Sequence, residues 1–399
     1  MKKIFFLLSF LLVSSNIINA QSNIDKVALD TLLKVAERTQ SDAIVIYKDG
    51  KLYGEYYFGG QPKPICAMSS TKSISNLAIG KLLTDGLLKS IDQPITDFYP
   101  EWKQGMKKDI TIRMLMNHTS GIQNLSSASE EINDSPDWVK LALASEIVTK
   151  PGTTFSYNNK AVNLLSGIVK RLTHKRMDSY LRDNIFILLG IENYSWEADA
   201  EGNTDAMGGL NILPSDLAKL GQFFMQKGNW EGKQIINSSW FDETVKPSEK
   251  KATCGLLWWL EYEINYKIID DAQIDTLKKI GFDATILKKI NQIKGKYTPE
   301  QYYPILNEKI LKTTQDWQKK YVPLLFANGI TLCRQGYENV VGYSTKGFLG
   351  NYMTIFPKSN LIVVRMISEN SFKSGNGNTA DNGPHNFYNF QDLAKNLVK

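Results

Sequence analysis

The sequence predicts an α+β fold of the α/β-type sandwich kind, in which helices flank an antiparallel sheet. A large helical subdomain is expected in addition to this sandwich. Two observations carry this prediction. Strand patterns occur near both ends of the chain, at residues 42–59 and 350–368, and the signals from residue 69 to about 260 are mostly helical. Strands from opposite chain ends that pair form one sheet, which the intervening helices cover. With 399 residues, 42% of them hydrophobic, the chain is long enough for one large domain.

The first elements after the N-terminal region are a helix and a hairpin. Residues 24–40 place apolar side chains at helical spacing. The stretches DAIVIYKDG and KLYGEYYFG follow, and Asp49-Gly50 at their junction is a strong signal for a two-residue hairpin turn. A second hairpin is expected near the C-terminus, where residues 357–360 separate two strands. A loop rich in Ser, Gly and Asn at 371–384 and a final helix complete the chain.

The segment that begins near Ser69 is predicted to be a buried helix, with a stop signal at Gly86. Its apolar residues recur at the three- and four-residue spacing that makes one helix face: Ile74, Leu77, Ala78, Leu82 and Leu83. The cluster of Ser, Thr and Lys at the start of so apolar a helix therefore needs an explanation of its own.

An additional segment, residues 261–329, separates the stretches GLLWWLEYE and GYSTKGFLGNYM and has helical signals of its own. Asp283 can cap a helix that Gly295 ends. Thr298 opens a second N-terminal signature, Thr-Pro-Glu-Gln, and Pro304 is expected to kink or stop that helix. Two interpretations stay open: a surface decoration that adds bulk, or a lid.

The first twenty residues have the pattern of a secretory signal peptide. Lys2 and Lys3 precede the apolar run 4–13, and small and polar residues continue to Ala20, after which cleavage is expected. That apolar run is well short of the roughly 20 residues that span a membrane. We therefore expect residues 21–399 to form a single periplasmic or secreted domain with no stable membrane anchor after signal cleavage.

Charge and residue counts argue against two classes of function. The formal net charge is +6, and removal of the two signal-peptide lysines leaves +4 without a dense basic run, so no nucleic-acid partner is expected. Three histidines without clustered partners and three widely spaced cysteines predict no metal and no cofactor. The cysteines are expected to be unpaired, because a chain of this size needs no disulfide. A small molecule or a short peptide remains as the expected partner.

Ser69 and Lys72 stand at i and i+3, so both side chains lie on one face of the first helical turn. A serine hydroxyl is a poor nucleophile at neutral pH and needs an adjacent base. A lysine can be that base when desolvation or a neighbouring cation lowers its pKa, and a helix N-terminus favours negative charge on the serine oxygen. Taken alone, the pair also fits a capping serine beside a solvated lysine.

A second candidate group precedes another helix with a buried face. Tyr157, Asn158 and Asn159 end the stretch PGTTFSYNN directly before it. A phenol near a lysine can pass protons to and from a leaving group, and an Asn amide can orient a substrate carbonyl. A tyrosine packed in a loop and a turn asparagine would explain the same residues in isolation.

Several ordered segments resemble the penicillin-recognising serine hydrolases, especially the branch with class C β-lactamases, D-alanyl-D-alanine carboxypeptidases and related esterases. The segments are SSTK, IRMLMNHTSGI, PGTTFSYNN, GGLNILPSDLAKLGQFFMQKGNWEGKQII and GFLGNYMTIFP, between about Asp42 and Ile367. Each is loose alone, but S-x-x-K is a motif of this superfamily and the order is specific. The resemblance implies a β-lactamase/transpeptidase-like fold. In this family NHTSGI is a structural turn, so His118 is not expected to be a catalytic base.

The resemblance also implies roles for the candidate residues. Ser69 would be the nucleophile that forms an acyl-enzyme, Lys72 its activating partner and Tyr157 a proton shuttle. Asn159 would hold the substrate or position Lys72. The oxyanion hole would consist of the backbone N–H groups of Ser69 and Phe348, each worth on the order of 3 kcal/mol by analogy with other hydrolases.

The chain departs from the family at the strand beside the cleft, which usually carries Lys or His, a small residue and Gly. When the two patterns are aligned on Gly347, Thr345 occupies the position at which the family has Lys or His. Lys346 stands one residue later, at the position of the small residue. Neighbouring strand residues face opposite ways, so Lys346 should point away from Ser69 unless a bulge changes the register. Thr345, Gly347 and Phe348 remain the expected substrate contacts, without a cation for a substrate carboxylate. We therefore expect hydrolysis of an ester or amide with weak or no β-lactam turnover.

Two other functions stay open. An exported location suits a D-alanyl peptide carboxypeptidase or a β-lactamase that acts on cell-wall-related substrates. A non-catalytic, penicillin-binding-like sensor would keep the cleft without turnover, although Ser69, Lys72 and Tyr157 are all present. In the family, the segment before the GFLG-like strand borders the cleft. Residues 261–329 are therefore expected near its mouth, where they would shape the acyl or leaving-group pocket.

Overall fold

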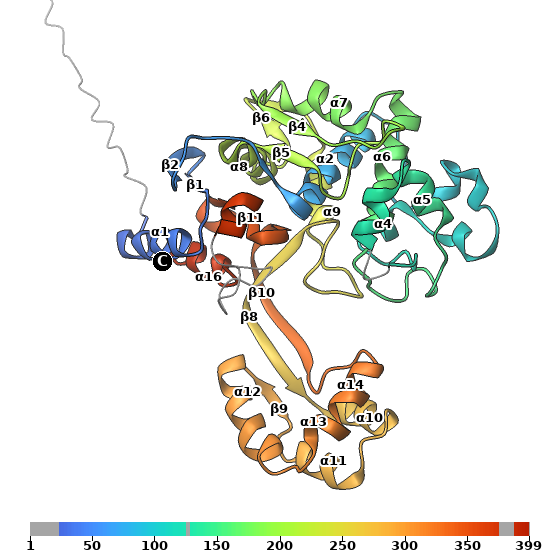
Figure 1. Cartoon of the computed structure of the whole chain (residues 1–399), viewed down its shortest axis with the longest axis vertical. Helices are drawn as coiled ribbons and strands as arrows, with labels where there is room; N and C mark the ends of the chain where they lie inside the picture. Colours follow the sequence, from blue (N-terminus) through green and yellow to red (C-terminus); the bar gives the residue numbers. More distant parts are fainter. Residues whose placement is uncertain (1–23, 125–127, 375–386, 399) are drawn as a thin grey trace, which may run out of the picture.

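A seven-stranded antiparallel sheet with helices on both faces forms the body of the protein (Figure 1). The structure is a computed structural model that describes residues 24–124, 128–374 and 387–398. The predicted signal peptide, residues 1–20, lies outside the described residues. The α+β prediction is confirmed, and the predicted loop at 371–384 begins inside a helix, α15 (Glu369–Ser374). Within the described part of the chain, no helix is both long and apolar enough to cross a membrane.

Strands from the two ends of the chain pair inside the sheet, one strand away from its β2 edge. In spatial order the strands are β2 (Lys51–Tyr57), β1 (Ala43–Lys48), β12 (Leu361–Met366), β11 (Asn351–Phe356), β10 (Arg334–Gly347), β8 (Trp259–Ile269) and β9 (Gly295–Tyr297). Both predicted hairpins are present, and β1 pairs with β12 to join them. The first hairpin turns through Asp49 and Gly50, both with positive φ, which is the conformation that Asp-Gly supports in a type I′ turn.

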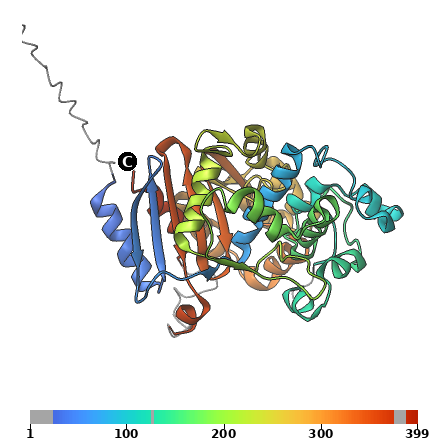
Figure 2. The ribbon, with the colours of Figure 1, turned by 90° about the horizontal axis from the view of Figure 1, so that it is seen from above.

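Each face of the sheet has its own helices, because successive strand side chains alternate between two cores. Helices α1 (Lys26–Arg38) and α16 (Phe390–Lys395) cover one face, where Ile44 and Val363 point. Helix α8 (Pro214–Met225) lies on the opposite face, where Val45 points (Figure 2).

The helical region lies beyond α8. Its helices are α2 (Thr71–Thr84), α3 (Ile112–Met116), α4 (Ala128–Asp134), α5 (Trp138–Ala144), α6 (Asn159–Thr173), α7 (Met177–Leu181) and α9 (Ser238–Thr244). Two small sheets accompany them: β3 (Ile65–Cys66), β5 (Leu210–Ile212) and β4 (Tyr194–Trp196) in one, β6 (Asn229–Trp230) and β7 (Lys233–Gln234) in the other. Helix α2 is buried over nearly its whole length, and Gly86 follows it with a φ of 71°. The predicted buried helix is thus confirmed.

The inserted segment forms a separate helical unit at the end of a two-stranded ribbon (Figure 1). Its helices are α10 (Asp271–Lys279), α11 (Ala284–Asn291), α12 (Pro299–Leu306), α13 (Trp317–Lys320) and α14 (Val322–Ala327). Residues 261–269 are not part of it, because they continue strand β8. Asp283 caps α11 as predicted, whereas Pro304 does not stop α12, which runs on into a π turn at Asn307–Leu311.

The helical unit has a core of its own. The members of this core are Ile269, Leu277, Phe282, Ile286, Ile290, Ile293, Tyr302, Ile310, Trp317, Tyr321, Leu332 and Cys333. Strands β8 and β10 carry the unit away from the start of α2 (Figure 1). The expectation that these helices border the cleft is therefore wrong, because a continuous ribbon, not a loop, precedes them. All three cysteines are unpaired, as predicted.

Because its core is separate, we expect the body to fold without this unit. Replacing residues 269–333 by Asn-Gly would join Ile268 to Arg334, which already face each other in the β8–β10 ladder. Calorimetry of the shortened chain should show the body's unfolding transition within about 4 °C of its Tm in the full chain, a change of about 1–2 kcal/mol. An aggregated or unfolded product would show instead that the body needs the helical unit.

Candidate active site

Ser69 and Lys72 meet at the start of α2. The chain leaves β3, passes Met68 with a φ of 51° and makes one 3₁₀ turn, Met68–Ser70, before the helix begins. Lys72 Nζ donates to Ser69 Oγ at 3.0 Å and to the carbonyl oxygen of Met207 at 2.6 Å. The Lys72 side chain is almost completely buried, and no side-chain cap forms at the start of either helix. The interpretation as a capping serine beside a solvated lysine is therefore wrong.

A loop at residues 205–210, whose last three residues open the resemblance segment GGLNILPSDLAKLGQ, holds the first turns of α2. Side chains of the helix donate to three consecutive carbonyl oxygens of this loop: Ser75 to Ala206, Lys72 to Met207 and Thr71 to Gly208. The Asp205 carboxylate bends the loop, because it accepts the N–H groups of Met207, Gly208 and Gly209. Burial raises the pKa of the Asp205 carboxyl, although these N–H groups and the nearby lysine act in the opposite direction. The sequence signal for this loop is an Asp followed three residues later by Gly-Gly.

Tyr157 reaches Lys72 from the start of α6. The centre of the Tyr157 ring is 4.9 Å from Lys72 Nζ. Between Tyr157 and Asn159, Asn158 is the N-cap of the helix, which fixes the direction in which the chain enters it. Asn159 Oδ1 is buried and has no hydrogen-bond partner in the described part of the chain, which leaves an acceptor available. The structure therefore brings Ser69, Lys72 and Tyr157 together and places Asn159 at the same end of α6.

The imidazole of His118 packs against the ring of Tyr157. Its ring centre is 4.6 Å from that of Tyr157, and its Nδ1 accepts the N–H of Asn158 at 3.2 Å. Burial, followed by the charge of Lys72, lowers the pKa of His118 to about 3. A neutral imidazole whose Nδ1 is already occupied agrees with the structural role expected for this turn.

Thr345 and Lys346 do not form a substrate-binding pair. Thr345 is completely buried: its Oγ1 donates to Ser70 Oγ at 3.0 Å and accepts the N–H of Met353. Its predicted role as a substrate contact is therefore not supported, because the strand turns this side chain under the start of α2. Lys346 lies on the other face of β10, as strand alternation predicts, with its Nζ 2.8 Å from Glu261 Oε1.

Gly347 and Phe348 end strand β10 against the chain that leads to Ser69. A Cβ on Gly347 would lie 2.4 Å from the carbonyl oxygen of Ala67, so only glycine permits this approach. Phe348 follows directly and opens a tight turn, and its side chain is half exposed. The contact thus brings the backbone of Phe348 toward the backbone of Ser69, where the two expected oxyanion donors lie.

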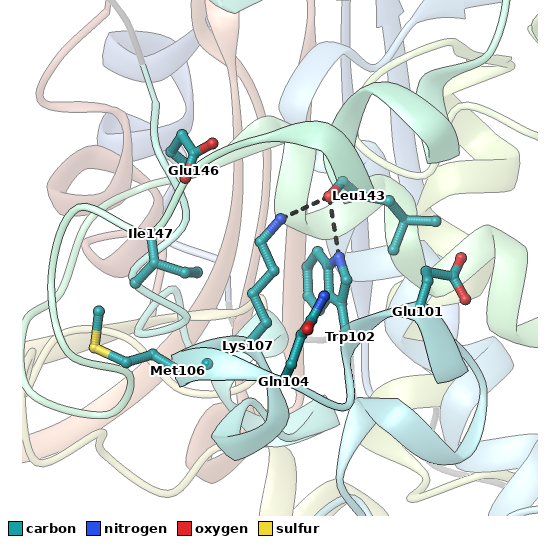
Figure 3. Close-up of a pocket in the computed structure, with 9 residues that line it drawn as sticks. Glu101, Trp102, Gln104, Met106, Lys107, Leu143, Glu146 and Ile147 are labelled. Atoms are coloured by element: carbon teal, nitrogen blue, oxygen red, sulfur yellow. Dashed lines mark hydrogen bonds between the residues drawn. The ribbon is translucent and has the colours of Figure 1, made fainter.

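A hollow of about 600 Å³ lies elsewhere, between the turns near residue 105 and the chain after α5 (Figure 3). Two polar groups of its wall, Trp102 Nε1 and Lys107 Nζ, both donate to the carbonyl oxygen of Leu143, at 3.0 and 2.8 Å. None of the paired serine, lysine and tyrosine groups lines it. It offers a place for a ligand but no nucleophile paired with a base.

Comparison with known proteins gives a consistent result. The Beta-lactamase family model matches residues 29–266. Among curated proteins, Protein flp of Staphylococcus aureus strain N315 is 26% identical over 208 residues, which cover 48% of this chain and 41% of that protein. The chain therefore spans less than half the length of this relative.

Two solved structures share the fold. The penicillin-binding protein from Bacillus halodurans has a TM-score of 0.55 at 15% identity and is covered over 97% of its length, with 86% of this chain. The octameric penicillin-binding protein homologue from Pyrococcus abyssi has a TM-score of 0.56 at 16% identity, covering 93% of this chain and 76% of that one. At such identities the likeness shows the fold alone.

Proposed function

The chain belongs to the Beta-lactamase family, a family of serine hydrolases, and on this basis we propose that it cleaves an ester or amide bond through an acyl-enzyme on Ser69. The observation that carries the proposal is the 3.0 Å contact between Ser69 Oγ and the Nζ of the buried Lys72. A serine hydroxyl in hydrogen-bond contact with a buried amine is the arrangement that nucleophilic catalysis requires.

In the proposed acylation step, Ser69 Oγ attacks the carbonyl carbon of the substrate while its proton passes to Lys72 Nζ. The tetrahedral intermediate then expels the leaving group, which takes a proton from the Tyr157–Lys72 pair. Water attacks the acyl-enzyme in the second step and gives one proton back through the same pair to Ser69. The 4.9 Å between the Tyr157 ring centre and Lys72 Nζ supports the placement of this tyrosine beside the lysine, which the proposed transfer requires.

The negative charge of the intermediate would be held by backbone N–H groups of Ser69 and Phe348. The close approach of Gly347 to Ala67 supports this assignment, since each donor lies within two residues of that contact. Donors aimed at the developing oxyanion contribute about 3–4 kcal/mol each when they are held in place. The buried acceptor of Asn159 would orient the substrate or Lys72.

The substrate we propose has no carboxylate next to the bond that breaks. Thr345 is uncharged and buried against Ser70, and the charge of Lys346 is paired with Glu261. Neither residue therefore offers an unpaired positive charge to a substrate carboxylate. Penicillins and D-alanyl-D-alanine peptides both carry such a carboxylate. We propose that the protein is exported and acts on a small molecule or short peptide, a reaction that requires no cofactor.

Mass spectrometry of quenched mixtures tests the proposal. The protein is mixed with p-nitrophenyl acetate, and separately with a penicillin, and then digested and mapped. We expect an acetyl group on the hydroxyl of Ser69 from the ester and little adduct or turnover with the penicillin. Rapid penicillin turnover would overturn the proposed substrate class in favour of a β-lactamase or a D-alanyl peptidase. No adduct from either reagent with folded protein would favour the penicillin-binding-like sensor.

A further inference from the structure

The turn that follows Phe348 has an unfavourable backbone conformation. Leu349 has a φ of 65° and Gly350 a φ of 88°, so two consecutive residues are left-handed. For a residue with a side chain this conformation is unfavourable, and it persists only where its surroundings impose it. Something must therefore hold residues 348–350 in place.

Arg365, near the C-terminal end of β12, makes that contact. Its side chain is completely buried between β1 and β11. Arg365 Nη1 donates to the carbonyl oxygens of Leu349 and Gly350, each at 2.8 Å. The other end of the same guanidinium donates to Ser41 Oγ at 2.8 Å and to the carbonyl oxygen of Thr39 at 3.0 Å. One rigid fork thus ties the turn to the chain before β1.

Asn351 ties the same turn to the nucleophile segment. Its Nδ2 donates to the carbonyl oxygens of Phe348 and Cys66, at 3.3 and 3.2 Å, and its Oδ1 accepts the N–H of Ile367 at 2.7 Å. Its carbonyl oxygen accepts from Ser70 Oγ at 2.8 Å. The turn after β10 and the residues around Ser69 are therefore one hydrogen-bonded assembly, with Arg365 beneath it.

Stability alone does not account for a buried arginine at this position. Transfer of a guanidinium out of water is costly, and an apolar side chain of similar volume in a sheet core often gives equal or greater stability. The neighbours of Arg365 on the same strand, Val364 and Met366, are apolar and fully buried. What an apolar side chain could not do is hold two carbonyl oxygens of a left-handed turn in fixed positions.

We infer that Arg365 is a positioning residue for the oxyanion hole: its guanidinium fixes the turn 348–350 and thereby the backbone N–H of Phe348. This inference rests on the proposed function, in which that N–H stabilises the tetrahedral intermediate. Misplacement of a catalytic donor by 1 Å can cost about 100-fold in rate. The residue itself lies too deep to touch the substrate.

The burst of p-nitrophenolate from p-nitrophenyl acetate tests this inference with Arg365→Lys. Burst amplitude counts competent sites, and burst rate gives the acylation rate constant at each site. A lysine cannot reproduce the fork that reaches both carbonyl oxygens. We expect the acylation rate constant to fall about 10–100-fold, below the loss of about 100–1,000-fold that removal of a whole oxyanion donor causes. The substrate dissociation constant should change less than about twofold, because ground-state contacts are retained.

A boronic acid that forms a tetrahedral adduct on Ser69 should lose affinity by the same factor as the rate constant. The matched control is Ser145→Ala, which removes one hydrogen bond of a buried serine hydroxyl at the end of α5, outside the assembly that holds the turn. It should lower the Tm but leave the acylation rate constant unchanged.

Three results would be decisive against these ideas. A reduced burst amplitude with an unchanged rate constant in Arg365→Lys would mean that Arg365 supports folding only. Should that variant not fold, Gly350→Ala strains the same turn through its positive φ, and an unchanged rate constant there would also overturn the inference. Absence of any burst from the wild-type protein would overturn the proposed function itself.

Discussion

Replacing Ser69 by alanine is expected to reduce hydrolysis of p-nitrophenyl acetate by about 10⁴–10⁶-fold, because the residue that forms the covalent intermediate is removed. Among the described residues the hydroxyl makes one hydrogen bond, to Lys72 Nζ, so the free energy of unfolding should change by only about 1 kcal/mol. Steady-state kinetics and urea unfolding of the same preparation measure the two effects. The acetyl adduct should be absent from the digest.

The control for this substitution is Ser239→Ala, in α9, where the side chain is exposed to solvent. Its activity should equal that of the wild type, which excludes a general effect of losing a hydroxyl. More than a tenth of the wild-type activity in Ser69→Ala would mean that another group is the nucleophile. The neighbouring Ser70 is a poor substitute, because its buried hydroxyl is engaged by Thr345 and by the carbonyl oxygen of Asn351.

The second large effect is expected for Lys72→Ala. Removal of the group that takes the serine proton should lower kcat by about 10²–10⁴-fold, the range typical of general-base catalysis. Because the carbonyl oxygen of Met207 would lose its donor, the free energy of unfolding should also fall, by about 1–3 kcal/mol. Stopped-flow acylation kinetics, normalised by the burst amplitude, separate the chemical effect from any loss of folded protein.

Two further variants make the Lys72 result specific. Lys72→Arg should not restore activity, because a guanidinium keeps its proton in proteins and cannot act as a base. Lys81→Ala, on the same helix, removes a lysine that pairs with Asp85 near the surface and should change stability by no more than about 1 kcal/mol without affecting kcat. Near-normal acylation in Lys72→Ala would show that the contact with Ser69 is structural.

The elements that could be predicted are those whose determinants lie within a few residues. The Asp49-Gly50 hairpin, the buried face of α2 and the cap of α11 at Asp283 depend on turn chemistry, periodicity and a single side chain. Such signals act within a few residues, so the structure that they favour does not depend on contacts with distant parts of the chain. The pairing of Ser69 with Lys72 belongs to this group, because one helical turn sets their separation.

The predictions that were wrong, and the contacts that the sequence analysis missed, have one common physical cause. The position of the helical unit depends on how far β8 and β10 continue to pair, which is a contact between segments about seventy residues apart in sequence. The burial of Thr345 depends on Ser70, and the loop bent by Asp205 acts only through its contacts with α2. Hydrogen bonds across such sequence separations leave no periodic signal.

By itself, the sequence determined the class of fold, the two terminal hairpins and the serine–lysine pair at the head of a buried helix. Each of these follows from side-chain spacing along one element. The family resemblance had already named Tyr157, but only the tertiary structure decided the contacts around the pair: the Tyr157 ring beside Lys72, Thr345 under Ser70, and Arg365 beneath the turn after Phe348. These contacts join segments far apart in the sequence, and their geometry is set by packing of the whole sheet against α2 and not by any local propensity.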